Sequence, residues 1–233
     1  MTLHDIKANY DDVRRSDFVG DYLAFKLKLM SEDAPDIVEF HYNLLGDQSN
    51  FRLYQILRAA FVERGQSVEP FLLEKLHTEH RPELKLDVIQ LLGTLGSIEV
   101  LPIVQKLLNS GNEDERYRSC IVLGWIGGND DLDRISKMLL NDSSAQLRGY
   151  AATALRQIWH RLPALKSKIL KVLILALAQE MDELAISLIV VSLQTILGKY
   201  FGIRENIRQS TLSGSGVAAK ERAQKFLSGY QIE

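Results

Sequence analysis

The chain has 233 residues, of which 46% are apolar and 25% charged, so it is neither a disordered nor a collagen-like sequence. Its 28 basic and 30 acidic side chains give a net charge of −2. This balance argues against a dedicated nucleic-acid-binding protein, because such proteins rely on a surplus of Lys and Arg. The single cysteine, Cys120, excludes an internal disulfide framework.

No segment has the length and hydropathy of a membrane span. The most apolar region, residues 169–197, is interrupted by the largely polar run Gln179–Glu183, and neither half reaches the roughly 18 apolar residues required. The first residues include an acidic side chain where a signal peptide would be apolar. We therefore expect a cytoplasmic protein that does not bind membranes.

The N-terminal part of the chain is acidic and the C-terminal part is basic. Residues 1–50 carry five basic and ten acidic side chains, whereas residues 151–233 carry eleven basic and six acidic ones. We predict that residues 1–46 form an acidic helical cap that steers a basic partner by long-range attraction. The alternative is that both ends carry only solvated faces. The candidate steering residues are Asp5, Asp11, Asp12, Asp17, Asp21, Asp33, Asp36 and Glu39.

Three segments in the middle of the chain are similar to one another at intervals of 31 and 32 residues. They are Leu84–Gly96, Glu115–Gly127 and Leu147–Trp159. Positions 1, 5, 8, 9 and 12 of each segment are mostly apolar or small and fall on one stripe of a helix. A second predicted helix follows the first two segments, over residues 98–108 and 130–140. Fainter copies at residues 60–76 and 193–196 extend the repeats to residues 47–200.

Glycines recur at two positions of these segments. Gly93 and Gly124 are small enough for close helix packing. Gly96 and Gly127 fall where a left-handed cap ends a helix.

The segments Leu147–Leu155 and Val122–Gly127 resemble the HEAT-like repeats noted in phycobilisome lyases, whose second helix has the pattern V-R-x-x-A-x-x-A-L-G-x-I-G. The resemblance implies an all-α fold, a right-handed superhelix (an α-solenoid) of antiparallel helix pairs. It also implies that the second helices line a concave surface. Residues 201–233 lie outside the repeats, and we expect a flexible tether and a C-terminal capping helix there, with the whole chain packed as a single domain.

Positions 4, 7 and 11 of each segment lie opposite the buried stripe, on the side that the resemblance makes concave. We expect these residues to bind another protein, because Trp, Tyr and Arg are frequent anchors of interfaces. The alternative is that Trp125 only covers the groove between neighbouring helices. The candidate partner-binding residues are Asp87, Gln90, Thr94, Arg118, Ile121, Trp125, Tyr150, Thr153 and Gln157.

The sequence contains little evidence of a metal site or a catalytic residue. His77 and His80 have a spacing that can chelate zinc on a helix, but Arg81 and Pro82 follow at once and no further ligand cluster accompanies them. Cys120 has no histidine nearby in the sequence and is expected to be a packing residue rather than a nucleophile. We expect no metal, no cofactor and no catalytic residue.

The first functional hypothesis is therefore a non-catalytic protein-binding module, such as an adaptor, an assembly chaperone or an inhibitor of the immunity-protein type, with a basic partner. The resemblance also suggests a phycobilin-lyase-like chaperone or enzyme, whose chromophore would be held by Arg116, Arg118 and Arg148. A third hypothesis is a HEAT-repeat enzyme similar to DNA glycosylases, which the acidic balance disfavours. A fourth is an interaction domain that belongs to a larger protein.

Overall fold

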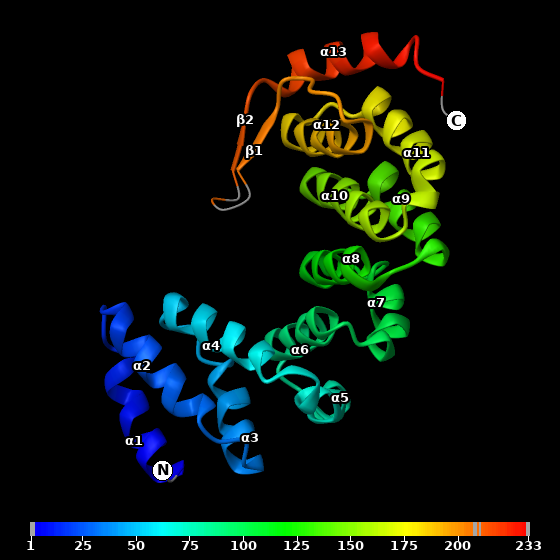
Figure 1. Cartoon of the computed structure of the whole chain (residues 1–233). Helices are drawn as coiled ribbons and strands as arrows, with labels where there is room; N and C mark the ends of the chain where they lie inside the picture. Colours follow the sequence, from blue (N-terminus) through cyan, green and yellow to red (C-terminus); the bar gives the residue numbers. More distant parts are fainter. Residues whose placement is uncertain (1–2, 207–208, 210, 232–233) are drawn as a thin grey trace. The chain divides into compact units, whose positions relative to one another are not determined.

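A computed structural model describes residues 3–206, 209 and 211–231 (Figure 1). The chain divides into two compact units, Met1–Leu95 and Gly96–Glu233, and each is described here by itself. Helices dominate both units, which confirms the expected all-α class built from helix pairs. The division between the units falls inside the segment 47–200, and packing as a single domain stays a prediction.

The first unit consists of three consecutive helix pairs. A 3-10 turn, Gly65–Val68, links the second pair to the third. The core of this unit includes four fully buried aromatic side chains, those of Tyr22, Phe25, Tyr42 and Phe61. The helices are α1 (Leu3–Val13) and α2 (Val19–Met30), α3 (Pro35–Leu44) and α4 (Phe51–Glu63), and α5 (Glu69–Thr78) and α6 (Pro82–Leu95).

The second unit contains three more helix pairs, each opened by a 3-10 turn, and a C-terminal extension. The pairs are α7 (Leu101–Leu107) and α8 (Glu113–Ile126), α9 (Leu132–Asn141) and α10 (Ala145–Arg161), and α11 (Lys166–Gln179) and α12 (Glu183–Leu197). The 3-10 turns are Ile98–Val100, Asn129–Asp131 and Pro163–Leu165. The extension is an antiparallel hairpin, β1 (Arg204–Asn206) and β2 (Thr211–Ser213), followed by α13 (Gly216–Leu227).

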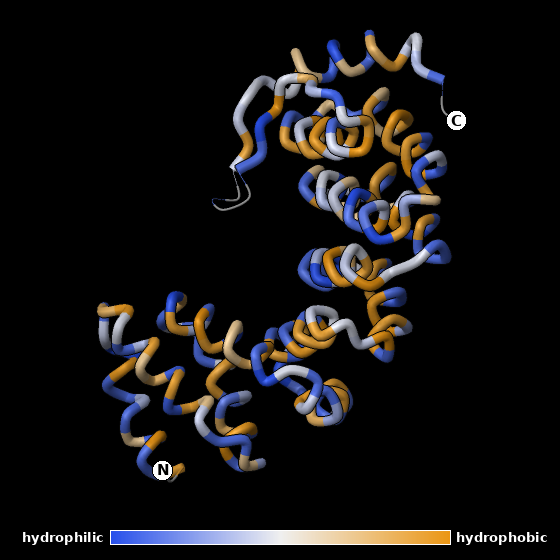
Figure 2. Tube along the Cα trace, in the orientation of Figure 1, coloured by the Kyte–Doolittle hydropathy of each residue, from blue (hydrophilic) through white to orange (hydrophobic). Residues whose placement is uncertain are grey.

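Two layers of helices make up the second unit. The second helices α8, α10 and α12 stack on one another, and the first helices α7, α9 and α11 form the other layer (Figure 1). The predicted buried stripe is largely confirmed: Val122 and Leu123 on α8 and Ala151, Ala154 and Leu155 on α10 are buried. Apolar residues are dense along α12, which is enclosed between α10 and α13 (Figure 2).

A recurrent turn precedes every second helix. In each turn an oxygen-bearing side chain accepts a hydrogen bond from the backbone amide two residues further on. This contact satisfies a backbone donor that would otherwise lack a partner at the helix start. The turn therefore recurs in each of the six helix pairs. The first of these turns precedes α2, ahead of residue 47, where the sequence predicts that the repeats begin. The acceptor residues are Ser16, Asp47, Glu79, Ser110, Asp142 and Glu180.

Four of these turn acceptors also bind a side chain from the preceding repeat. In the first unit, the hydroxyl of Tyr10 donates to Asp47 (2.8 Å) and that of Tyr42 donates to Glu79 (2.6 Å). In the second unit arginines replace the tyrosines, as described below. Each of these contacts joins two successive repeats, so the repeats are held together by polar contacts as well as by the apolar core.

The glycines act in two ways, one of them unexpected. A Cβ atom added at Gly124 would lie 3.1 Å from Ala154 and against the side chain of Gln157, which confirms close packing of α8 on α10. Gly96 has the expected left-handed backbone, with φ of 78°. Gly127 does not: its φ is −64°, and a Cβ atom there would collide with the backbone carbonyl oxygen of Leu123 and lie 3.1 Å from the carboxylate of Asp131, so the lack of a side chain serves close packing instead.

The segment after residue 200, where we expect a flexible tether, contains the hairpin of β1 and β2, and its flexibility stays a prediction. The side-chain amide of Gln194 accepts a hydrogen bond from the backbone of Phe201 (2.7 Å) and donates one to the carbonyl of Ile203 (2.9 Å). The guanidinium of Arg156 on α10 makes a bidentate ion pair with the carboxylate of Glu205 on β1, with N–O distances of 2.8 and 3.0 Å. The capping helix α13 is confirmed and begins after Ser215, whose hydroxyl accepts from the backbone of Ala218.

In the part of the chain that the structure describes, no helix is both long enough and apolar enough to cross a membrane.

Candidate partner-binding site

The outward residues of α8 and α10 form two half-exposed stripes. On α8 the stripe consists of Arg118, Ile121 and Trp125, and on α10 it consists of Tyr150, Thr153 and Gln157. Each set has the spacing i, i+3 and i+7, which places its members on one side of a helix. The two stripes lie on neighbouring helices, because α8 packs directly on α10. Six of the nine predicted partner-binding residues therefore lie on two neighbouring second helices of the second unit.

The other three predicted residues lie on α6, in the first unit. Thr94 is exposed and Gln90 is half-buried. Asp87 was expected to face outward, and this was wrong because its side chain is fully buried. The hydroxyl of Tyr54 on α4 donates to its carboxylate (2.8 Å), and Nε of Arg58 lies 3.7 Å from the same group. Asp87 is thus a buried polar link between α4 and α6 and does not offer a free surface to a partner.

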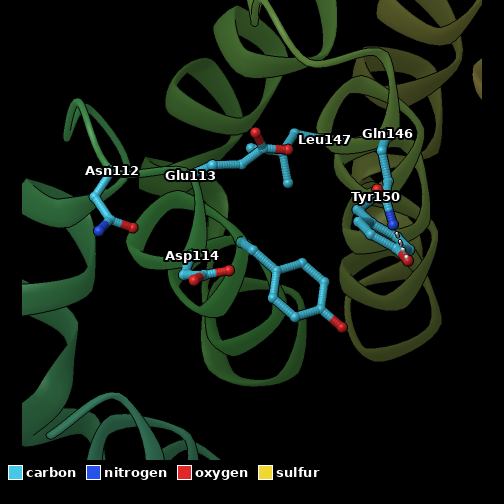
Figure 3. A pocket seen from close by; sticks show the side chains of 7 residues that line it. Asn112, Glu113, Asp114, Gln146, Leu147 and Tyr150 are labelled. Carbon is cyan, nitrogen blue, oxygen red and sulfur yellow. Dashed lines mark hydrogen bonds between the residues drawn. The ribbon is translucent and has the colours of Figure 1, made fainter. Parts of the chain in front are cut away.

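A pocket of about 410 Å³ opens between the N-terminal halves of α8 and α10 (Figure 3). Two tyrosines line it, Tyr117 and Tyr150, and their ring centroids are 5.1 Å apart. The acidic residues Glu113 and Asp114 come from the first turn of α8. The remaining lining residues are Asn112, Gln146 and Leu147.

Most polar side chains that line the pocket make hydrogen bonds within the chain. Glu113 accepts a hydrogen bond from the hydroxyl of Ser144 (2.7 Å), and the amide of Gln146 donates to the hydroxyl of Tyr150 (3.0 Å), as drawn in Figure 3. Asn112 caps α8 by accepting from the backbone of Glu115 (3.2 Å). Within the described residues, no hydrogen bond or ion pair reaches the exposed carboxylate of Asp114.

The pocket lies next to the predicted outward face and shares only Tyr150 with it. The other lining residues were not predicted as binding residues, because they lie outside the helix positions opposite the buried stripe. One signal was present: Tyr117 and Tyr150 stand 33 residues apart, close to the repeat interval. Aromatic residues at nearly equivalent places of successive second helices lie on neighbouring helices in a stack of this kind.

Arg116 and Arg148 are committed to contacts between repeats. Arg116 makes a bidentate ion pair with Asp142 (2.8 and 3.1 Å), and Arg148 makes a bidentate ion pair with Glu180 (2.6 and 2.8 Å). Each guanidinium also donates to the backbone carbonyl six residues before it, that of Ser110 for the first and of Asp142 for the second. The hydrogen bonds from Arg148 lower the pKa of Glu180 to about 2.

The predicted steering residues Asp5, Asp11, Asp12, Asp17, Asp21, Asp33 and Asp36 are all exposed in the first unit, and Glu39 is half-buried. Some of them already have partners: Asp11 lies 3.1 Å from Arg14, and Asp21 accepts from the hydroxyl of Ser16 (2.5 Å). Asp33 pairs with the buried guanidinium of Arg64 (2.5 Å). These carboxylates therefore have local roles besides any effect on a partner.

Cys120 is fully buried in α8, as expected for a packing residue. Burial raises the pKa of its thiol to about 12, so the thiolate that a nucleophile requires is disfavoured. Groups of three or more His, Cys, Asp or Glu side chains arranged to hold a metal ion are absent from the residues that the structure describes.

The comparisons with known proteins agree with the repeats. Residues 69–156 match the family model of HEAT repeats, a segment that runs from the start of α5 into α10. No curated protein matches the chain. The match supports the HEAT-like resemblance without assigning the phycobilisome-lyase subtype. With the helix pairs, the recurrent turn and the polar contacts between repeats, it indicates that residues 69–156 form HEAT-like repeats.

Proposed function

We propose that this chain is a non-catalytic protein-binding module that holds one partner on the outward stripes of α8 and α10. The observation that carries the proposal is the half-exposure of Trp125, Tyr150 and Arg118 on two adjacent helices whose core packing is made by other residues. These three residue types dominate the binding energy of many protein interfaces. HEAT repeats serve in general as protein-interaction modules, which supports the same conclusion.

The acidic character of the N-terminal part favours a basic partner. Asp12 and Asp17 are exposed and would attract such a partner from a distance, raising the association rate more than the final affinity. An inhibitor of the immunity-protein type, an adaptor and an assembly chaperone are all consistent with this mode of binding. They differ in what the partner does once it is bound.

The enzymatic alternatives have less support from the arrangement of side chains. A chromophore site was expected to use Arg116, Arg118 and Arg148, but Arg116 and Arg148 each hold a carboxylate of a following turn. A nucleic-acid enzyme needs several cations along its groove. The outward stripes contain one arginine, Arg118, and the neighbouring pocket adds the carboxylates of Glu113 and Asp114.

The test is affinity capture from native extract treated with nuclease, using the unaltered chain and two variants. The variant Trp125→Ala removes the aromatic side chain of the α8 stripe, and Lys137→Ala removes an exposed side chain of α9 as the matched control. We expect one stoichiometric protein that the unaltered chain and Lys137→Ala retain and Trp125→Ala loses. Equal capture by all three chains, or none by any, would contradict the proposal.

A folding control accompanies this experiment, because Trp125 is half-buried. Thr153→Arg places a large charged side chain on the neighbouring stripe without removing any packing atoms of the tryptophan. The helical circular dichroism and thermal midpoint of both variants should match those of the unaltered chain. Loss of capture by Thr153→Arg at full stability would show that the stripe acts in binding rather than in folding.

A further inference from the structure

The pocket between α8 and α10 has the components of a receptor for a cationic side chain. Its lining supplies two aromatic rings, Tyr117 and Tyr150, and two carboxylates, Glu113 and Asp114, but no lysine or arginine. Aromatic faces attract cations through their quadrupole, and a carboxylate beside them adds direct charge attraction and a hydrogen-bond acceptor.

Charge at the pocket mouth is negative even after the helix dipole is considered. The first turn of α8 contains Glu113, Asp114 and Glu115. The N-terminus of a helix carries about +0.5 of an elementary charge, so three carboxylates outweigh it. Glu115 is held by the hydroxyl of Ser110 and Glu113 by that of Ser144, which leaves Asp114 as the exposed carboxylate with the greatest freedom to meet a ligand.

The first unit contains a complete example of the same chemistry. The ammonium of Lys75 lies 5.3 Å from the ring centre of Tyr42 and 5.0 Å from that of Phe71. The same nitrogen is 2.8 Å from the carboxylate of Glu39. A cation, two rings and a carboxylate thus assemble within one unit of this chain. The lining of the pocket in the second unit has rings and carboxylates of the same kind.

We infer that this pocket binds an arginine side chain of the protein partner. A guanidinium is planar and weakly hydrated, so it stacks on a tyrosine ring while its N–H groups donate to a carboxylate, which a compact ammonium does less well. The amide oxygen of Gln146, whose nitrogen donates to Tyr150, is available to accept a further N–H group. This inference rests on the proposed protein-binding function and specifies the chemistry of the partner.

The direct test needs no partner. The probe is a blocked Gly-Arg-Gly peptide, titrated into the full chain while the ring signals of its tyrosines are followed by NMR. The control peptide contains citrulline, which keeps the shape of arginine and lacks its charge. We expect saturable shifts for Tyr117 and Tyr150, a dissociation constant on the order of millimolar, and at least about tenfold weaker binding of the citrulline peptide.

Two variants test whether the arginine peptide binds in this pocket. Asp114→Asn keeps the size of the side chain and removes its charge, and Tyr150→Leu keeps apolar bulk and removes the π face. Both should weaken binding of the arginine peptide by about fivefold or more, and the affinity should fall with added salt. Asp133→Asn, at an exposed aspartate of α9, is the matched control and should bind as the unaltered chain does.

Equal binding of the arginine and citrulline peptides, or binding that Asp114→Asn and Tyr150→Leu leave unchanged, would overturn the inference. So would the absence of any saturable shift. These outcomes are separate from the capture experiment. A partner that depends on Trp125 but not on Asp114 would leave the protein-binding function in place and remove the arginine pocket.

Discussion

The polar contacts between repeats make a strong prediction for Arg148→Ala. The substitution removes two charge-assisted hydrogen bonds to Glu180, at 2.6 and 2.8 Å, and one to the backbone carbonyl of Asp142, at 2.8 Å. The arginine side chain is 20% exposed and the glutamate 5%, so the carboxylate left behind is almost fully buried. Breaking a buried pair costs about 3–5 kcal/mol, and partial exposure reduces this to about 2–3 kcal/mol.

The assay is urea unfolding followed by tryptophan fluorescence. Both tryptophans, Trp125 and Trp159, lie in the second unit, so their emission reports the unfolding of the unit that contains the pair. We expect the midpoint to fall by about 1 M urea, and Glu180→Gln to have a smaller effect. The double variant should show a coupling energy of at least about 1 kcal/mol between the two positions.

Dependence on pH gives a second readout of the same contact. The pKa of Glu180 is lowered to about 2 in the folded chain, against an ordinary value of 4.5. The pair therefore stabilises the fold above pH 4.5, and this contribution is lost as the pH falls towards 2. The difference between the unaltered chain and Arg148→Ala should close over the same range. A difference below about 0.5 kcal/mol at pH 7, or no coupling in the cycle, would refute the structural role assigned to Arg148.

Three further changes have expected outcomes. His41 is buried, and its pKa is lowered to about 3. The free energy of unfolding should therefore fall by about 1.4 kcal/mol for each pH unit below pH 6.5, as measured by circular dichroism. His41→Gln should flatten this slope between about pH 5 and 6.5. Gly124→Val should destabilise the second unit by about 2 kcal/mol in urea, because its side chain meets the backbone of Ala154; unchanged stability would contradict the close packing. Gln194→Ala should speed amide exchange at Phe201 while leaving the thermal midpoint nearly unchanged; unaltered exchange would show that other contacts hold this segment.

The second helices could be predicted from the sequence because their evidence is local. A stripe of apolar residues and a repeat interval are visible within each segment, and the observed helices Pro82–Leu95, Glu113–Ile126 and Ala145–Arg161 contain the predicted positions with shifts of one or two residues at their ends. The recurrent turn was harder to detect, since its acceptor is a serine, an aspartate or a glutamate. What is constant is the hydrogen bond that this side chain accepts from the backbone amide of the second residue after it.

Features that depend on distant partners could not be predicted. The burial of Asp87 requires the hydroxyl of Tyr54, which stands 33 residues earlier on another helix. The strands Arg204–Asn206 and Thr211–Ser213 are too short to show an alternating pattern, and Glu205 is fixed by Arg156 of α10. The pocket likewise arises from two helix starts, and neither start suggests a cavity by itself.

The most direct test of the binding face is hydroxyl-radical footprinting of the chain with and without its captured partner. Trp125 and Tyr150 have reactive aromatic side chains on the proposed face, and Tyr200, which is 59% exposed beyond the end of α12, serves as an internal control. The proposed function predicts that the partner protects Trp125 and Tyr150 while Tyr200 reacts as before. Full reactivity of Trp125 and Tyr150 in the complex would contradict it.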